Sequence, residues 1–285
     1  MSEALAEADL EIVPAGDEIL PGYAAIELLS RNRALDVYDA WRATRSCRVI
    51  VKVPRPDRRE DPGTRRRLLR EGRILLGLSH PHVVRAYELV REPELGLVLE
   101  TLSGATLEHI VGATAPRRLP ATEVAVLGCQ LCSAMGYTHA QDVLHLDLKP
   151  SNIVAEAGRA KVIDFNLARP PGPGVRGSGT RPYMAPEQAR GDVLGPAADV
   201  WGIGATLFEA ATGGPPFGRP EEDDRYEQLE RRAVPVRTLR RMPAVLAEAI
   251  DACLEPDVDA RPTVEELGSR LGEVAERPSA QEHPA

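Results

Sequence analysis

Cysteine is scarce in this sequence, with four residues in 285. Cys47, Cys129, Cys132 and Cys253 are too few and too scattered for the disulfide framework of a small secreted domain. Cys129 and Cys132 form a C-x-x-C pair, but no second pair or nearby histidine cluster completes a zinc site. We therefore expect both to be buried structural thiols, and we expect the chain to reside in a reducing cytoplasm.

Long apolar runs, a basic start and an excess of positive charge are also missing. No segment approaches the roughly 18 continuous apolar residues of a membrane helix, so we expect no membrane association. The acidic start MSEALAEADLEIVPAGDE lacks the features of a secretion signal. A formal net charge of −8 argues against a general nucleic-acid binder, and we expect no nucleic-acid partner.

What the chain does have is enough length and apolar content for one large domain or two closely packed lobes. Its first third alternates turns with runs typical of strands, at 23–29, 35–42, 47–53, 83–90 and 96–101. One helix is expected there, from Thr64 to Leu78, because apolar residues recur at helical spacing after Asp61 and Pro62.

From about residue 105 the pattern becomes helical, with stretches at 121–140, 197–212, 243–254 and 263–275. The Gly- and Pro-rich segment 170–179 predicts a mobile loop rather than an element. The two ends, 1–17 and 277–285, are expected to be flexible. The pattern therefore predicts an α+β fold, with strands mainly in the first section and helices mainly in the second.

Three segments carry polar residues in a fixed order: HLDLKPSN at 145–152, VIDFNLA at 162–168 and GTRPYMAPE at 179–187. They resemble the catalytic loop, the metal-binding segment and the APE segment of eukaryotic-type serine/threonine protein kinases, which bacteria also contain. Each polar residue alone could cap a turn, but their order and spacing together favour the family. The resemblance covers about residues 22–275. It implies a bilobal kinase fold. The N-lobe, at 18–102, would be small and mostly β with one main helix, and the C-lobe, at 103–276, would be larger and mostly α.

Phosphoryl transfer needs a carboxylate near the attacking hydroxyl, metal ions on the phosphates, and cations where charge accumulates. By resemblance, Asp147 is the base or orients the hydroxyl, and Lys149 reaches the transferred phosphate, as in the serine/threonine subgroup. Asn152 and Asp164 would supply oxygen ligands for Mg²⁺, with Mn²⁺ as an alternative. The resemblance implies ATP as the cofactor and a protein with Ser or Thr acceptors as the substrate.

The resemblance also places a phosphate-anchoring lysine at Lys52, the last residue of VIVK, with Glu71 as its partner. Residue spacing supports the pair independently. Glu71 shares the apolar face of its helix with Leu68, Leu75 and Leu78. A carboxylate on such a face needs a partner.

The segment GLVLETLSGATL at 96–107 resembles the hinge between the lobes, with Leu99 at the gatekeeper position. The backbone from Glu100 to Leu102 is expected to bind adenine. Three apolar positions match those that sandwich the adenine ring: Val37, Ile50 and Val154. Ile50 stands where alanine is usual and would narrow the pocket. Three further matches are structural: a buried ion pair between Glu187 and Arg261, and Asp199, which steadies the catalytic loop.

The glycine-rich loop of the family is missing, because its glycine positions hold Ser30, Asn32 and Leu35. Side chains there obstruct the approach of backbone N–H groups to phosphates, so we expect weak or unusual ATP binding. Asn32 tolerates a left-handed backbone better than most residues. Arg31 and Arg33 either contact phosphate or, as we favour, face solvent.

Two further departures affect metal binding and control. Asn166 replaces the glycine that follows Asp164 and Phe165, and we expect it to accept a left-handed backbone. Leu146 replaces the arginine that pairs with a phosphate on the activation loop, which argues against control by phosphorylation of that loop. Ser178 is a better phosphosite candidate than Thr180, because Thr180 matches a family residue that contacts Asp147. An unmodified flexible loop is the open alternative, because serine is common in such segments.

The leading hypothesis is therefore an ATP- and Mg²⁺-dependent serine/threonine protein kinase. A pseudokinase, which keeps the fold as a binding or scaffold module, is the alternative favoured by the altered loop and by Asn166. A small-molecule kinase is a third hypothesis, but GTRPYMAPE argues against it. The sequence leaves open whether a regulatory protein partner, a concentration change or a modification brings the signal.

Overall fold

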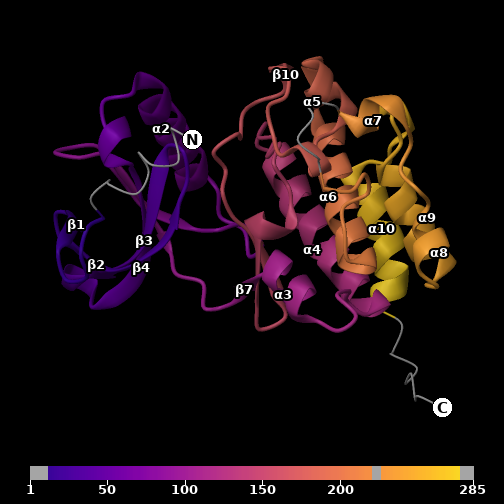
Figure 1. Cartoon of the computed structure of the whole chain (residues 1–285), viewed down its shortest axis with the longest axis horizontal. Helices are drawn as coiled ribbons and strands as arrows, with labels where there is room; N and C mark the ends of the chain where they lie inside the picture. The colour runs from indigo at the N-terminus through magenta and orange to yellow at the C-terminus, as the bar shows by residue number, and fades with distance from the viewer. Residues whose placement is uncertain (1–11, 220–225, 277–285) are drawn as a thin grey trace, which may run out of the picture. The chain divides into compact units, whose positions relative to one another are not determined.

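The computed structural model describes residues 12–219 and 226–276. The predicted flexible tail 277–285 and residues 1–11 of the predicted flexible start lie outside these ranges. Contacts divide the chain into two units. The first is Met1–Ser79 with Val84–Ser103, and the second is His80–Val83 with Gly104–Ala285. In Figure 1 the described residues are coloured from indigo near the N-terminus to yellow near the C-terminus.

The first unit is built on a six-stranded antiparallel sheet with the order β1-β2-β3-β4-β6-β5. Its strands are β1 (Glu18–Leu20), β2 (Tyr23–Arg31), β3 (Leu35–Arg42), β4 (Cys47–Pro54), β5 (Ala86–Val90) and β6 (Gly96–Glu100). All five predicted strands are present, and β1 is an addition that the sequence did not reveal. Short 3₁₀ turns occur at Ala43–Arg45 and Pro56–Arg58.

The two faces of this sheet differ, because side chains alternate along each strand. Tyr38, Ala40, Val49 and Val51 belong to one buried apolar cluster on one face. The residues between them in sequence point to the opposite face. This opposite face therefore remains for the side chains with predicted binding roles.

The helix of the first unit is α2 (Pro62–Gly77), close to the predicted 64–78. The Asp61 carboxylate accepts a hydrogen bond of 2.6 Å from the Thr64 amide, and Pro62 occupies the first helical position. Both residues are typical of helix starts. The buried face of α2 carries Leu68, Glu71 and Leu75, as the spacing predicts.

The second unit is mainly helical. Its helices are α3 (Leu107–Ala113), α4 (Ala121–His139), α5 (Pro186–Arg190), α6 (Pro196–Thr212), α7 (Glu227–Glu230), α8 (Val236–Leu239), α9 (Ala244–Cys253) and α10 (Val264–Ala275). The four long helices match the predicted stretches to within one residue at each end. Helix α4 packs against α6 and α10 (Figure 1). At Gly128 a Cβ atom would lie 2.5 Å from a Leu271 methyl group, so a larger residue there would displace the Leu271 side chain.

Two small sheets complete the second unit. One has the order β7-β8-β9, from β7 (Ala105–Thr106), β8 (Ile153–Glu156) and β9 (Arg159–Val162). The other pairs β10 (Gly172–Pro173) with β11 (Val193–Leu194). The prediction that 170–179 contains no element is therefore wrong at Gly172–Pro173. Short turns lie at Pro150–Asn152, Arg181–Tyr183 and Val258–Ala260.

Within the described ranges, no helix combines the length and the apolar character that crossing a bilayer requires.

Candidate active site

Asp147 lies at the centre of a hydrogen-bond network in the second unit. Its Oδ1 accepts a hydrogen bond of 2.7 Å from the Thr180 hydroxyl. Its Oδ2 accepts hydrogen bonds of 2.8 Å from Lys149 Nζ and 3.1 Å from Asn152 Nδ2. Lys149 Nζ also donates to Thr180 Oγ1 at 2.7 Å. The structure thus brings together three residues predicted to be catalytic, and it confirms the predicted contact with Thr180.

Asp199 on α6 holds the backbone that precedes Asp147. It accepts hydrogen bonds of 2.8 Å from the His145 amide and 2.7 Å from the Leu146 amide, and a third of 2.8 Å joins it to His139 Nε2. Leu146 has a φ of 66°, a conformation that non-glycine residues adopt only where surrounding contacts hold it. Asp199 provides two of those contacts with this loop, as predicted.

The electrostatics of Asp199 fit this anchoring role. Burial raises its pKa, but hydrogen bonding to His139 and the charges of His139 and His145 lower it more. The net result is that the pKa lies below its ordinary value. The carboxylate is therefore ionised and can accept several hydrogen bonds at once.

The hairpin of β8 and β9 brings Asn152 and Asp164 to the same end of two paired strands. Ile153 is opposite Val162, and the Ile163 amide donates to the Asn152 carbonyl at 2.9 Å. Asn152 therefore lies directly before β8, and Asp164 lies two residues after the end of β9. The register of the hairpin, rather than sequence proximity, places them together.

The donor set of these two residues fits Mg²⁺. The Asn152 amide nitrogen donates to Asp147. The amide oxygen therefore points away from Asp147 and is the atom that would bind the metal. Asp164 adds a carboxylate. Among the described residues, no group of three or more His, Cys, Asp or Glu side chains could hold a metal ion. Two oxygen ligands suit a cation such as Mg²⁺, which is commonly bound by one or two protein groups together with phosphates and water.

The left-handed position in this segment differs from the prediction. Asp164 has a φ of 64°, whereas Asn166 is not among the residues with positive φ. The expectation that Asn166 would occupy a left-handed conformation is therefore wrong. Its Nδ2 donates to Asp164 Oδ2 at 3.2 Å, so the replacement supports the Asp164 carboxylate.

Gln130 on α4 was missed by the sequence reasoning. Its Oε1 accepts a hydrogen bond of 2.6 Å from the Ala160 amide, and its Nε2 donates to the Gly158 carbonyl at 3.0 Å. These bonds attach the turn of the β8–β9 hairpin to α4. A glutamine inside a helical pattern gives no signal for such a long-range contact.

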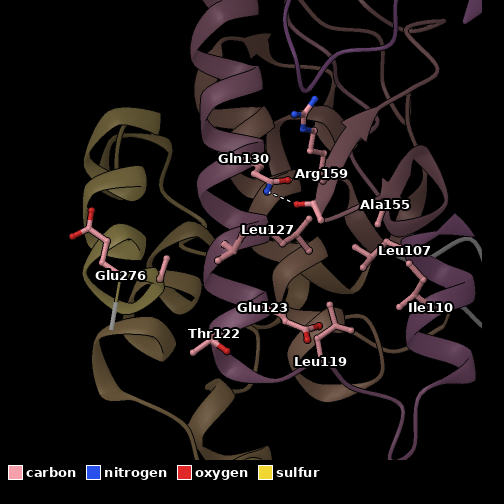
Figure 2. Close-up of a pocket in the computed structure, with 14 residues that line it drawn as sticks. Leu107, Ile110, Leu119, Thr122, Glu123, Leu127, Gln130, Ala155, Arg159 and Glu276 are labelled. Carbon is pink, nitrogen blue, oxygen red and sulfur yellow. Dashed lines mark hydrogen bonds between the residues drawn. The ribbon is translucent and has the colours of Figure 1, made fainter. Parts of the chain in front are cut away.

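Gln130 also borders a cavity of about 580 Å³ in the second unit, shown in Figure 2. Apolar side chains of α3 and α4 line it, including Leu107 and Leu127, together with the β8–β9 turn. The cavity contains none of the predicted site residues, and the sequence did not reveal it.

In the first unit, Lys52 and Glu71 form the predicted ion pair. Lys52 Nζ lies 2.7 Å from Glu71 Oε1, and the side chains are 9% and 0% exposed. Removal of both charges from water is compensated by the short contact between them. The pair joins β4 to α2 within the unit.

Three other predicted residues share the Lys52 face of the sheet. Val37 is paired with Lys52, Leu99 is paired with Ile50, and cross-strand partners lie on the same face. Ile50 and Lys52 are two residues apart and therefore also share a face. The pattern brings Val37, Ile50 and Leu99 beside Lys52, on the face opposite the apolar cluster.

The predicted hinge residues belong to the end of the first unit. The Glu100 amide donates to the Arg85 carbonyl at 2.9 Å, and its carboxylate accepts from the Arg85 amide at 2.8 Å. The amide and the carboxylate of Glu100 are therefore both engaged by Arg85 within the first unit. Leu102 follows β6 and is half-buried. Val154, the third apolar position, lies on β8 of the second unit.

The missing glycine loop is replaced by the three-residue turn Asn32, Arg33 and Ala34 between β2 and β3. Asn32 is not among the residues with positive φ, so its tolerance of that conformation is not used. Arg31 makes two hydrogen bonds with the Asp36 carboxylate, at 2.7 and 2.8 Å. Arg31 is therefore only partly exposed, whereas Arg33 is exposed as favoured.

The predicted ion pair of Glu187 and Arg261 supports the second unit. Arg261 Nη1 and Nη2 donate to the two carboxylate oxygens at 2.6 and 2.8 Å, and both residues are buried. The guanidinium group also lies 5.0 Å from the ring centre of Trp201. The pairing is thus confirmed.

The thiols fit structural roles. Cys132 and Cys253 are buried, and burial raises the pKa of both. Cys129 is only half-buried, so the prediction of burial holds for one member of the C-x-x-C pair. Burial raises the pKa of Cys129 as well, and its Sγ lies 3.9 Å from the Gly268 carbonyl.

Fold and site are those of a protein kinase domain, and comparison with known proteins agrees. The protein kinase domain family matches residues 29–270. The chain belongs to this family.

Two of the similar proteins are bacterial kinases. Serine/threonine-protein kinase PkaA of Streptomyces coelicolor is 34% identical over 238 residues, which cover 80% of this chain and 43% of the relative. Serine/threonine-protein kinase PknB of Mycobacterium tuberculosis is 38% identical over 185 residues, which cover 59% of this chain and 29% of the relative. The chain thus spans less than half the length of these relatives.

The fold is also seen in a solved structure. The kinase domain of Mycobacterium tuberculosis PknI is similar with a TM-score of 0.72, covering 93% of this chain and 100% of that domain. At 22% identity this likeness shows the fold alone. The predicted bilobal kinase fold of α+β class is confirmed by this likeness and by the family match.

Proposed function

We propose that this chain is an ATP- and Mg²⁺-dependent protein kinase that transfers the γ-phosphate of ATP to Ser or Thr hydroxyls of proteins. The observation that carries this proposal is the Asp147 carboxylate, held by Lys149, Asn152 and Thr180. A carboxylate fixed on both oxygens can accept or orient a hydroxyl proton in one geometry.

Each residue in this network has a separate role. Asp147 orients the acceptor hydroxyl, and Lys149 offsets the negative charge that accumulates on the transferred phosphoryl group. Asn152 and Asp164 would hold Mg²⁺, or Mn²⁺ in its place. The cation supplies charge neutralisation on the nucleotide phosphates when it is bound.

The residues proposed to bind nucleotide lie mainly in the first unit. Lys52, positioned by Glu71, would contact phosphate. The backbone of Glu100 and Leu102 would bind adenine, and three apolar side chains would pack against the ring: Val37, Ile50 and Val154. Ile50 narrows this space relative to alanine.

A protein substrate is favoured over a small molecule by the ordered segment 179–187. The Tyr183 hydroxyl donates to Glu209 Oε2 at 2.5 Å, and Gln228 Nε2 donates to the Met184 carbonyl at 2.9 Å. In the second unit this segment follows Asp164 in sequence and contacts Asp147 through Thr180. Thr180 thus attaches this segment to the proposed catalytic carboxylate. We further propose a cytoplasmic location, where the four free thiols stay reduced.

The test is phosphoryl transfer from labelled ATP, with Mg²⁺ or Mn²⁺ and protein acceptors, by wild type, Asp147→Asn and Asp164→Ala. We expect transfer to Ser or Thr in wild type and a loss of about 100-fold or more in each variant. Equal transfer in all three would contradict the catalytic assignment. Nucleotide-dependent stabilisation without transfer would instead indicate a pseudokinase that binds nucleotide as a scaffold.

A further inference from the structure

The turn between β2 and β3 closes without glycine. The Asn32 amide donates to the Leu35 carbonyl at 3.0 Å, which joins the two strands across three residues. None of the residues from Asn32 to Leu35 has a positive φ. Ordinary residues can therefore occupy a position where the family uses glycine.

The side chain of Asn32 makes two hydrogen bonds within this turn. Its Oδ1 accepts two hydrogen bonds of 2.8 Å, one from the Ala34 amide and one from the Leu35 amide. Two successive backbone N–H groups that converge on one oxygen form the concave arrangement by which proteins hold phosphate oxygens. In this chain the oxygen in that arrangement belongs to Asn32 itself.

Contacts from β3 and from Arg55, the residue after β4, hold the turn in this form. Arg55 Nη1 donates to the Asn32 carbonyl at 3.1 Å, and the Arg55 amide donates to the Ala34 carbonyl at 2.9 Å. Arg55 is buried, and its Nε lies 3.0 Å from Asp57 Oδ1. On the other side, Arg31 pairs with buried Asp36. The turn is thus anchored at both ends. It would keep its place if Asn32 Oδ1 released the Ala34 and Leu35 amides.

We propose that Asn32 Oδ1 occupies the place of a phosphate oxygen and keeps the turn amides from the nucleotide. The inference rests on the proposed nucleotide-dependent function and concerns its affinity. Asn32 is a positioning residue that acts through the Ala34 and Leu35 amides. Nucleotide is then held by the Lys52 face of the sheet and by the cation, and the turn contributes no hydrogen bonds to it.

Substitutions at Asn32 test this directly. Asn32→Gly and Asn32→Ala both remove the internal acceptor, and the alanine variant does so without the flexibility of glycine. We expect each to bind ATP and ADP with Mg²⁺ about tenfold more tightly, because hydrogen bonds to a charged phosphate are stronger than those to a neutral amide oxygen. KM for ATP should fall while kcat stays unchanged. Asn32→Asp keeps the acceptor and adds negative charge, so it should bind about tenfold more weakly.

Two readouts are independent of catalysis. Isothermal titration with ADP and Mg²⁺ gives the affinities. Hydrogen exchange of the Ala34 and Leu35 amides should be unaffected by ADP in wild type, and slowed by ADP in the glycine and alanine variants. Asp257→Ala is the matched control, because the exposed Asp257 side chain accepts from the Asp259 amide at 3.1 Å in the second unit. It should leave ADP affinity unchanged.

Thermal melting first establishes that the glycine and alanine variants are folded. The inference is overturned if these folded variants bind ADP no more tightly than wild type. It is also overturned if ADP protects the two amides in wild type, or if no variant binds nucleotide. Tighter ADP binding by these variants without phosphoryl transfer would remove the proposed kinase activity and leave the inference standing.

Discussion

The hydroxyl of Thr180 donates a hydrogen bond of 2.7 Å to Oδ1 of Asp147, although the two residues are 33 positions apart. Lys149 bonds to both partners, so the three side chains form a closed set. The segment that contains Thr180 therefore fixes the orientation of the proposed catalytic carboxylate.

Thr180→Ala should lower kcat by about 10- to 100-fold, because a misplaced catalytic group loses the benefit of orientation. Thr180→Ser keeps the hydroxyl and should retain most of the activity. Steady-state kinetics with saturating ATP measure the effect. If the alanine and serine variants have the same kcat, the hydroxyl does not orient Asp147.

Glu71→Gln should destabilise the first unit and weaken nucleotide binding, since buried Lys52 loses the charge of its partner at 2.7 Å. We expect a loss of about 3 kcal/mol in the free energy of unfolding. Glu94→Gln is the control, because its pair with Arg59 is exposed and should contribute less than about 1 kcal/mol. Urea unfolding and ADP titration measure the two effects. Equal losses in both variants would contradict a special role for the buried pair.

Arg261→Ala should lower the free energy of unfolding by about 3–5 kcal/mol, because it leaves Glu187 buried without its cation. Arg232→Ala removes a similar arginine–glutamate contact, of 2.6 Å to Glu255, but the Arg232 side chain is 69% exposed. That control should change stability by less than about 1 kcal/mol. Chemical denaturation of the second unit checks the difference. A loss below 1 kcal/mol in Arg261→Ala would show that Glu187 finds another partner.

The pKa of Asp199 is lowered in the folded state, so its ionised form stabilises the fold above the pKa of the unfolded chain. This stabilisation should be lost as the pH falls through the folded-state pKa. The free energy of unfolding should therefore fall more steeply for wild type than for Asp199→Asn, from about pH 5 downward. Urea titrations at several pH values measure it. Parallel curves for the two proteins would contradict the assignment.

Patterns along the chain predicted much of this molecule. Short runs of strand-forming residues between turns located the strands that carry Val37 and Lys52, and helical spacing placed Glu71 on a buried face. The order of the three polar segments identified the kinase family and the residues around Asp147. These features are local, because strand and helix periodicity and turn chemistry depend on neighbours in sequence.

Other features depended on contacts between distant segments. Sequence could not show that Gln130 attaches the β8–β9 turn, or that the left-handed residue is Asp164 rather than Asn166. In the same way, the sequence marked Asn32 only as a missing glycine, and the folded turn showed that its side chain bonds two backbone amides. Residue type and spacing determined the family and the candidate chemistry. Only the tertiary structure decided which donor meets which acceptor, because a hydrogen bond depends on distances and angles that the packing of whole elements sets.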